Sequence, residues 1–123
     1  MFMRNITLFL FWWFLFFSIS TSSADNEINL DVDENGEYDA LSDGLLIIRY
    51  LFGLTGDDLV SGILGSNSLV VEPIEIKSKL DSMRANLDVD GNGSVDALTD
   101  GLLILRYLFG LRGDSLVTQA IGT

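Results

Sequence analysis

Residues 29–60 read NLDVDENGEYDALSDGLLIIRYLFGLTGDDLV, and residues 86–117 read NLDVDGNGSVDALTDGLLILRYLFGLRGDSLV. The two stretches are identical at 25 of 32 positions. Each begins with a segment rich in Asp, Asn and Gly and continues into a long apolar run. A duplication of this kind predicts two copies of one structural unit, and the apolar runs would be covered most simply by packing against each other.

The acidic segment of each repeat has the spacing of a calcium-binding loop. With Asp31 as position 1, oxygen-bearing groups recur at alternate positions up to the ninth, and Gly36 stands sixth, where a sharp turn is needed. Calcium takes roughly 6–8 oxygen ligands, whereas magnesium sheds its waters reluctantly, so Ca²⁺ suits the loop better. We expect two calcium ions, bound by Asp31, Asp33, Asn35, the carbonyl of Glu37, Asp39 and Asp43, and by Asp88, Asp90, Asn92, the carbonyl of Ser94, Asp96 and Asp100.

The acid that closes each loop stands one position late. An EF-hand-type loop has a bidentate acid at position 12, where these loops have Ser42 and Thr99. Asp43 and Asp100 follow at position 13. A helix that begins near position 9 would place Asp43 one turn beyond Asp39, facing the loop, so we expect Asp43 and Asp100 to be the closing ligands. The alternatives are closure by Ser42 and Thr99, or acids that only stabilise the helix N-terminus.

Helices are predicted to follow both loops. In the first repeat, the mostly apolar residues 40–52 predict a helix, Gly53 is suited to end it, and Asp57 is a candidate N-cap for a short second element. The second repeat has the same features at residues 97–109, Gly110 and Asp114.

Residues 61–85 would form a linker and one more helix that leads into the second loop. Pro73 suits the first turn of this helix, and apolar residues continue it at Ile74, Ile76, Leu80 and Met83. Only a few residues precede the first loop in the exported part of the chain. The first unit should therefore be loop–helix, and the second helix–loop–helix.

The N-terminal stretch has the profile of an export signal. Arg4 is followed by an almost wholly apolar run over residues 6–19, and small residues end the stretch at Ser22, Ser23 and Ala24. We expect residues 1–24 to be a signal peptide and residues 25–123 to be a secreted, periplasmic or cell-surface domain. The run is shorter than the ~20 residues that span a bilayer. The alternative is an uncleaved anchor, the one case in which we expect membrane contact.

Composition excludes several classes of function. The 123 residues include 18 Asp and Glu, 7 Lys and Arg, no Cys and no His, and every acid follows residue 24. Nucleic acid is a poor partner for such a charge. The commonest general bases and nucleophiles are missing, so we expect no enzyme. Without disulfides, folding of so small a domain should depend on the bound cations.

Duplicated D-x-D-x-N-G loops, each followed by a helix that contains RYL, resemble a type I dockerin. The resemblance implies a mostly α module of two calcium loop–helix units that binds two Ca²⁺ and docks a protein partner. That partner would be cohesin-like or unknown, and the setting a polysaccharide-degrading assembly. The alternatives are an EF-hand-type calcium buffer or sensor, and a self-assembling structural protein, for instance a homodimer.

Overall fold

A computed structural model of the protein describes residues 27–122, so the predicted signal peptide lies outside the described residues. Helices joined by turns and irregular segments make up residues 27–122, and no strand occurs among them. The mostly α fold class is therefore confirmed. Within the same residues, no helix has the length and apolar character needed to cross a lipid bilayer.

Each repeat folds into the same three helical segments. The first repeat has a π-helical turn, η1 (Ala40–Gly44), which runs directly into α2 (Leu45–Leu51), and then a short helix, α3 (Asp57–Val60). The second repeat has η3 (Ala97–Gly101), α5 (Leu102–Leu108) and α6 (Asp114–Val117). Gly53 and Gly110 follow the main helices with φ of +85° and +88°, a conformation that suits glycine and ends a helix.

The two short helices begin one residue earlier than an N-cap at Asp57 or Asp114 requires. Their N-caps are Gly56 and Gly113, both with φ of +58°. The prediction that the two acids are the caps was wrong, because the chain turns through a positive φ before each helix and glycine tolerates this best. Each Asp is instead the first helical residue, where a negative charge is favourable.

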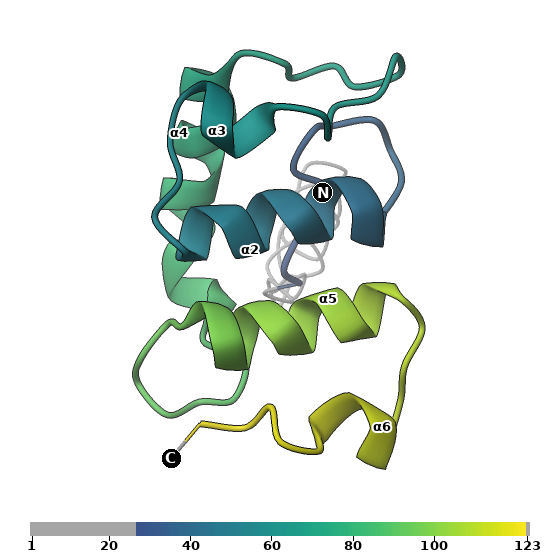
Figure 1. Ribbon diagram of the computed structural model, residues 1–123, viewed down its shortest axis with the longest axis vertical. Coiled ribbons are helices and arrows are strands. Elements are labelled where there is room, and N and C mark those ends of the chain that lie inside the picture. The colour runs from purple at the N-terminus through teal and green to yellow at the C-terminus, as the bar shows by residue number, and fades with distance from the viewer. Residues whose placement is uncertain (1–26, 123) are drawn as a thin grey trace, which may run out of the picture.

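The linker helix forms as α4 (Pro73–Met83), with Pro73 in its first turn as predicted. Ile76, Leu80 and Met83 are buried on one face, whereas Ile74 is 74% exposed and does not belong to that face. A 3₁₀ turn, η2 (Arg84–Leu87), connects α4 to the second loop. In Figure 1, α4 lies beside α2 and α3, with which it is in contact.

The main helices of the two repeats cross closely and run antiparallel (Figure 1). A Cβ atom on Gly44 would lie 2.8 Å from Leu105 Cδ1, and one on Gly101 would lie 3.2 Å from Ile48 Cγ1. Gly44 matches Gly101 in the repeat, and Ile48 matches Leu105, so the contact is reciprocal. The repeats are thus related by a local two-fold axis, and glycine lets the two helices approach.

The core lies mainly under α2, α3 and α4. Its completely buried apolar side chains are Val32, Leu46, Ile47, Leu59, Ile76, Leu80 and Leu87. Ile104 joins this core from the second repeat. Covering by α4 therefore makes the first repeat the better buried of two nearly identical units.

Candidate metal centres

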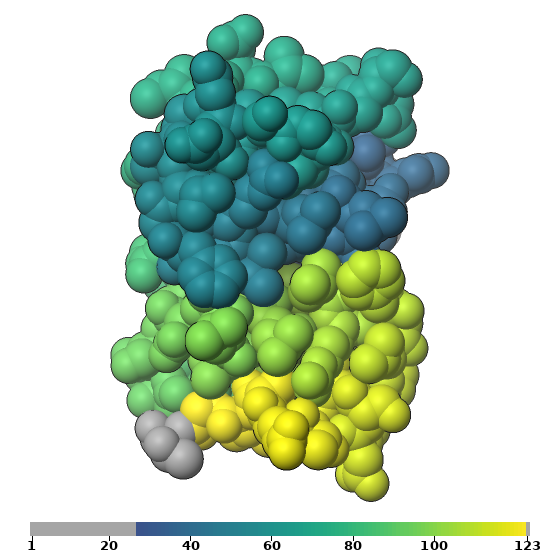
Figure 2. Space-filling model, viewed as in Figure 1, coloured from purple at the N-terminus to yellow at the C-terminus, as the bar shows by residue number. Residues whose placement is uncertain are grey.

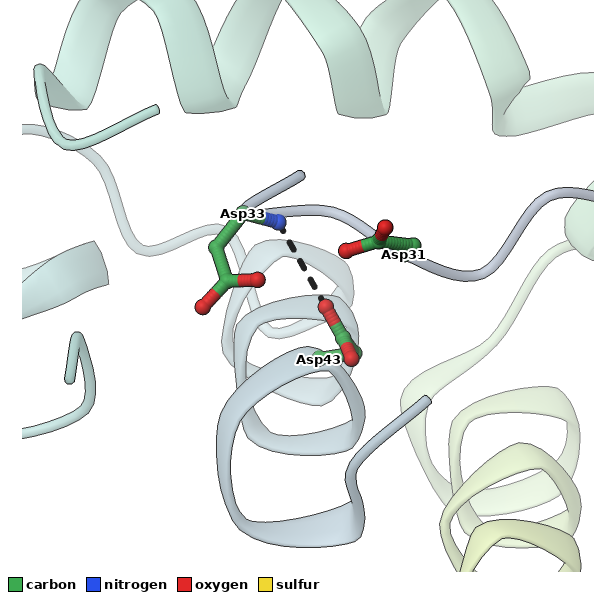
Figure 3. A group of neighbouring side chains, drawn as sticks. All are labelled: Asp31, Asp33 and Asp43. Atoms are coloured by element: carbon green, nitrogen blue, oxygen red, sulfur yellow. Dashed lines mark hydrogen bonds between the residues drawn. The ribbon is translucent and has the colours of Figure 1, made fainter. Parts of the chain in front are cut away.

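Three carboxylates converge in each loop. Asp31, Asp33 and Asp43 each offer one oxygen atom, and these atoms lie within 4.8 Å of one another (Figure 3). The same repeat positions form the second group: Asp88, Asp90 and Asp100. Each group could hold a metal ion, so the fold provides two equivalent candidate centres.

The π-helical turn explains how a thirteenth-position acid reaches its loop. The N–H of Gly44 donates to the carbonyl oxygen of Asp39 at 3.0 Å, five residues earlier, and Gly101 donates to Asp96 at 3.0 Å. A π turn holds one residue more than an α turn. The additional residue compensates for an acid that stands one position late, which returns Asp43 to the loop. Sequence reasoning missed this turn, although a one-residue delay present in both copies was a signal for it.

The Asp43 carboxylate fastens the start of the helix to the start of the loop. Its Oδ1 accepts hydrogen bonds from the N–H groups of Val32 at 2.7 Å and Asp33 at 3.4 Å, the latter drawn in Figure 3. Its Oδ2 accepts the N–H of Asp39 at 2.9 Å. Asp100 makes the corresponding bonds, at 2.8, 3.2 and 2.9 Å, with Val89, Asp90 and Asp96. A carboxylate has about four lone-pair sites, so both can still bind a cation.

The first centre concentrates negative charge out of water. Asp33 and Asp43 are completely buried. Burial raises the pKa of the Asp43 carboxyl above its usual value, and the neighbouring Asp33 charge adds to this, while the N–H donors of Asp39 and Val32 oppose it. Lys79 of α4 donates to the Asp31 carbonyl oxygen and to the Glu34 carboxylate. No Lys or Arg among residues 27–122 forms an ion pair with the three converging carboxylates.

Such a centre fits a hard divalent cation. Buried charges in proteins are normally paired or coordinate a metal. Here no described Lys or Arg pairs with the converging carboxylates, so a metal ion would have to supply the positive charge. The donors available are oxygens throughout, which suit Ca²⁺ or Mg²⁺ rather than a soft transition metal.

The loop backbone is shaped around its own carboxylates. Asp31 accepts the N–H groups of Asn35 at 3.1 Å and Gly36 at 2.9 Å, and the side-chain oxygen of Asn35 accepts the N–H of Glu37 at 2.8 Å. The second loop repeats this pattern with Asp88, Asn92, Gly93 and Ser94. Gly36 and Gly93 both have φ of +87°, as the predicted sixth-position turn requires.

Other predicted ligands lie at the margin of the converging groups. The side chains of Asp39 and Asp96 are exposed and are not among the three carboxylates that meet in each loop. Their role as ligands stays a prediction. The hydroxyl oxygens of Ser42 and Thr99 are buried and have no hydrogen-bond partner among the described residues.

In both loops, the Asp at the third position accepts hydrogen bonds from distant parts of the chain. The Ser68 hydroxyl donates to Asp33 Oδ2 at 2.6 Å, and the N–H groups of Leu69 and Val70 donate to the Asp33 carbonyl oxygen. In the second loop, the N–H of Gly122 donates to Asp90 Oδ2 at 2.6 Å. Sequence reasoning missed these contacts, because nothing in the repeats marks the residues that fold back onto them.

Comparison of the chain with protein-family models, with curated proteins and with solved structures gives no match. The function must therefore be argued from the geometry of the two centres and of the surfaces around them.

Proposed function

We propose that the protein is an exported, non-enzymatic module that binds two calcium ions and docks a protein partner. The observation that carries the calcium proposal is the convergence of three carboxylates in each repeat, with Asp33 and Asp43 completely buried. Calcium is favoured over magnesium because the loops offer many oxygens in a flexible arrangement, whereas magnesium usually keeps several of its waters.

The ligand sets follow the two-fold repeat. The three converging carboxylates of each loop would bind directly, and Asp43 and Asp100 would close the loops in preference to Ser42 and Thr99. The remaining oxygens would come from Asn35, the Glu37 carbonyl and Asp39 in the first loop, and from Asn92, the Ser94 carbonyl and Asp96 in the second.

Calcium would stabilise the fold by neutralising charge that the side chains leave unpaired. Asp43 links the ion to the N–H groups of Val32 and Asp39, and so to both ends of the loop. Gly44 follows directly and lies at the crossing with α5. An ion held by Asp43 would therefore fix the start of the helix pair as well as the loop.

A matched pair of exposed apolar residues on each repeat supports the docking proposal. Leu41 and Phe52 stand before and after α2, Leu98 and Phe109 stand before and after α5, and all four side chains are more than half exposed. We call these four residues the docking strip. The antiparallel helices place Leu41 at the same end as Phe109, so the strip is two-fold symmetric and one partner site could accept either repeat. Figure 2 shows the α2 and α5 regions side by side on one face of the molecule.

This strip favours docking or self-assembly over a calcium buffer or sensor. A calcium buffer or sensor that acts alone has no use for four exposed large apolar side chains at matched positions. A self-assembling protein would use them, because a two-fold patch can pair with itself. A cohesin-like partner in a polysaccharide-degrading assembly is the specific form of docking that the dockerin resemblance suggests.

A calcium-dependent pull-down from the exported fraction tests the docking proposal. We expect the wild-type protein to recover another protein in calcium but not in EGTA, and the double variant Leu41→Asp, Leu98→Asp to lose it. Ile74→Asp is the matched control, because Ile74 is also largely exposed but lies on α4. Recovery of the protein alone, sedimenting as a stable dimer, would replace docking with self-assembly.

A further inference from the structure

The two repeats have matching sequences, but only the first is covered by a packed helix. α4 packs against the first repeat, where Tyr50 is 7% exposed and Leu59 is completely buried. The matching Tyr107 is 48% exposed, and Leu116 is only partly buried. Among residues 27–122, no second helix lies on α5 and α6 in the way that α4 lies on α2 and α3.

An apolar groove of about 690 Å³ lies on this less covered face. α5 and α6 contribute Leu103, Tyr107, Leu116 and Val117 to its walls, and Ile28 and Ile121 extend the groove beyond the helices. Asp90, from the second loop, also lines it. The local two-fold axis relates these α5 and α6 positions to the surface that α4 covers in the first repeat.

We propose that this groove, which we call the α6 groove, binds an amphipathic helix of a partner protein, with an apolar face flanked by basic residues. α4 shows the chemistry that the equivalent surface accepts. It buries Ile76, Leu80 and Met83, while Lys79 reaches the adjacent loop and binds Asp31 and Glu34. A helix in the α6 groove would similarly direct a basic residue at the second loop.

Charge favours such a helix over a second copy of this chain. The protein has a formal net charge of −11 at pH 7, which two divalent cations would reduce without reversing, and Asp114 lies at the start of α6. Two copies would repel each other, whereas a basic segment would be attracted. Tyr107 is the repeat equivalent of Tyr50, whose hydroxyl donates to Asp81 of α4, so Tyr107 could donate in the same way to a bound helix. The inference rests on the docking part of the proposed function and does not depend on which cation the loops bind.

The chain supplies a probe, because a free peptide with the sequence of residues 72–85, EPIEIKSKLDSMRA, carries the α4 pattern. The experiment adds this peptide, labelled with fluorescein, to protein purified from the exported fraction and follows fluorescence anisotropy in calcium. We expect saturable binding of one peptide per chain. The variant Val117→Asp should weaken binding about tenfold or more, since it removes an apolar contact and adds a charge in the groove.

Controls separate the α6 groove from the docking strip. Phe109→Asp is an equally polar change outside the groove and should leave peptide affinity within about twofold. A peptide with Asp at the positions of Ile76 and Leu80 should not bind. Circular dichroism must show that Val117→Asp is folded. If it is not, Ile121→Asp takes its place, because Ile121 is more exposed.

Four results would overturn the inference. They are the absence of saturable binding at millimolar peptide, equal loss with Phe109→Asp, a protein dimer that Val117→Asp dissociates, and binding that begins only after an uncleaved N-terminal segment is removed. The last two would assign the groove to a second copy or to the chain's own N-terminus. A positive pull-down with no peptide binding would reject the groove and leave docking through the strip intact.

Discussion

The N–H of Val32 donates a 2.7 Å hydrogen bond to the carboxylate of Asp43, eleven residues later in the chain. This bond connects the beginning of the first loop to the π-helical turn that leaves it. Asp100 repeats the relationship with Val89 at 2.8 Å. A thirteenth-position acid therefore has a defined place in both loops.

Replacing Asp100 should weaken calcium binding at the second centre more than replacing its neighbour Thr99. Asp100→Asn removes the charge from a buried side chain that faces Asp88 and Asp90, so we expect calcium affinity at that centre to fall by about tenfold or more. Thr99→Ala should have little effect. Calorimetric titration of both variants measures this, and a larger effect of Thr99→Ala would show that the twelfth residue closes the loop.

Removing calcium should unfold the domain and not only empty the loops. The core is small, no disulfide is available, and two of the three converging carboxylates in the first loop are completely buried. We expect EGTA to reduce the far-ultraviolet circular dichroism signal of helix and to abolish a cooperative melting transition. An identical spectrum and melting curve with and without EGTA would refute the coupling.

The two repeat tyrosines should differ in their contribution to stability. Tyr50 is buried and its hydroxyl donates to Asp81 Oδ1 at 2.7 Å, whereas Tyr107 is half exposed. We expect Tyr50→Phe to lower the free energy of unfolding by about 1–2 kcal/mol, and Tyr107→Phe by less than about 0.5 kcal/mol. Urea unfolding in calcium measures both, and equal effects would contradict the unequal cover of the repeats.

The contribution of the Tyr50–Asp81 hydrogen bond should depend on pH at both extremes. Lys77, and then Tyr50, lower the pKa of Asp81, so its contribution is present above the unfolded value of about 3.9 and is lost as pH falls through the folded pKa. Burial, and then Asp81, raise the pKa of Tyr50, so its contribution is present below about 10 and is lost as pH rises through the folded pKa. The stability difference between wild type and Tyr50→Phe should therefore be largest between these limits, and a difference that does not vary with pH would reject this origin.

Replacing Gly44, which lies at the crossing of α2 and α5, should destabilise the protein unless Leu105 is also made smaller. A Cβ on Gly44 would lie 2.8 Å from Leu105 Cδ1, so Gly44→Ala should cost about 1–3 kcal/mol despite the better helix propensity of alanine. Adding Leu105→Ala should cost less in the Gly44→Ala background than in wild type, because the new methyl group fills part of the cavity. Additive effects in this double-mutant cycle would show that the contact is absent.

The sequence was sufficient for the elements that depend on local chemistry. The helix that follows each loop, Pro73 at the start of α4, and glycine at the sixth loop position lie where the pattern predicts, and three of the duplicated acids in each loop converge. Local signals suffice here because each is set by backbone conformation or by side-chain periodicity within one turn.

Features that depend on tertiary contacts could not be predicted from the sequence. The π-helical turn forms because Asp43 must reach Val32, and Ser68 approaches Asp33 only after the linker folds back. Unequal cover of nearly identical repeats arises from α4, which packs on α2 and α3, whereas no described helix packs on α5 and α6 in the same way. Ile74 is exposed because the buried face of α4 is fixed by Ile76, Leu80 and Met83.

Calorimetric titration of calcium-free protein from the exported fraction tests the central claim most directly. We expect two calcium ions per chain, with affinities of about 10⁻⁴ M or tighter and little competition from millimolar magnesium. The double variant Asp43→Asn, Asp100→Asn should lose both, while Ser42→Ala, Thr99→Ala should retain them. Binding of one ion, or no heat at millimolar calcium, would contradict a protein built around two calcium centres.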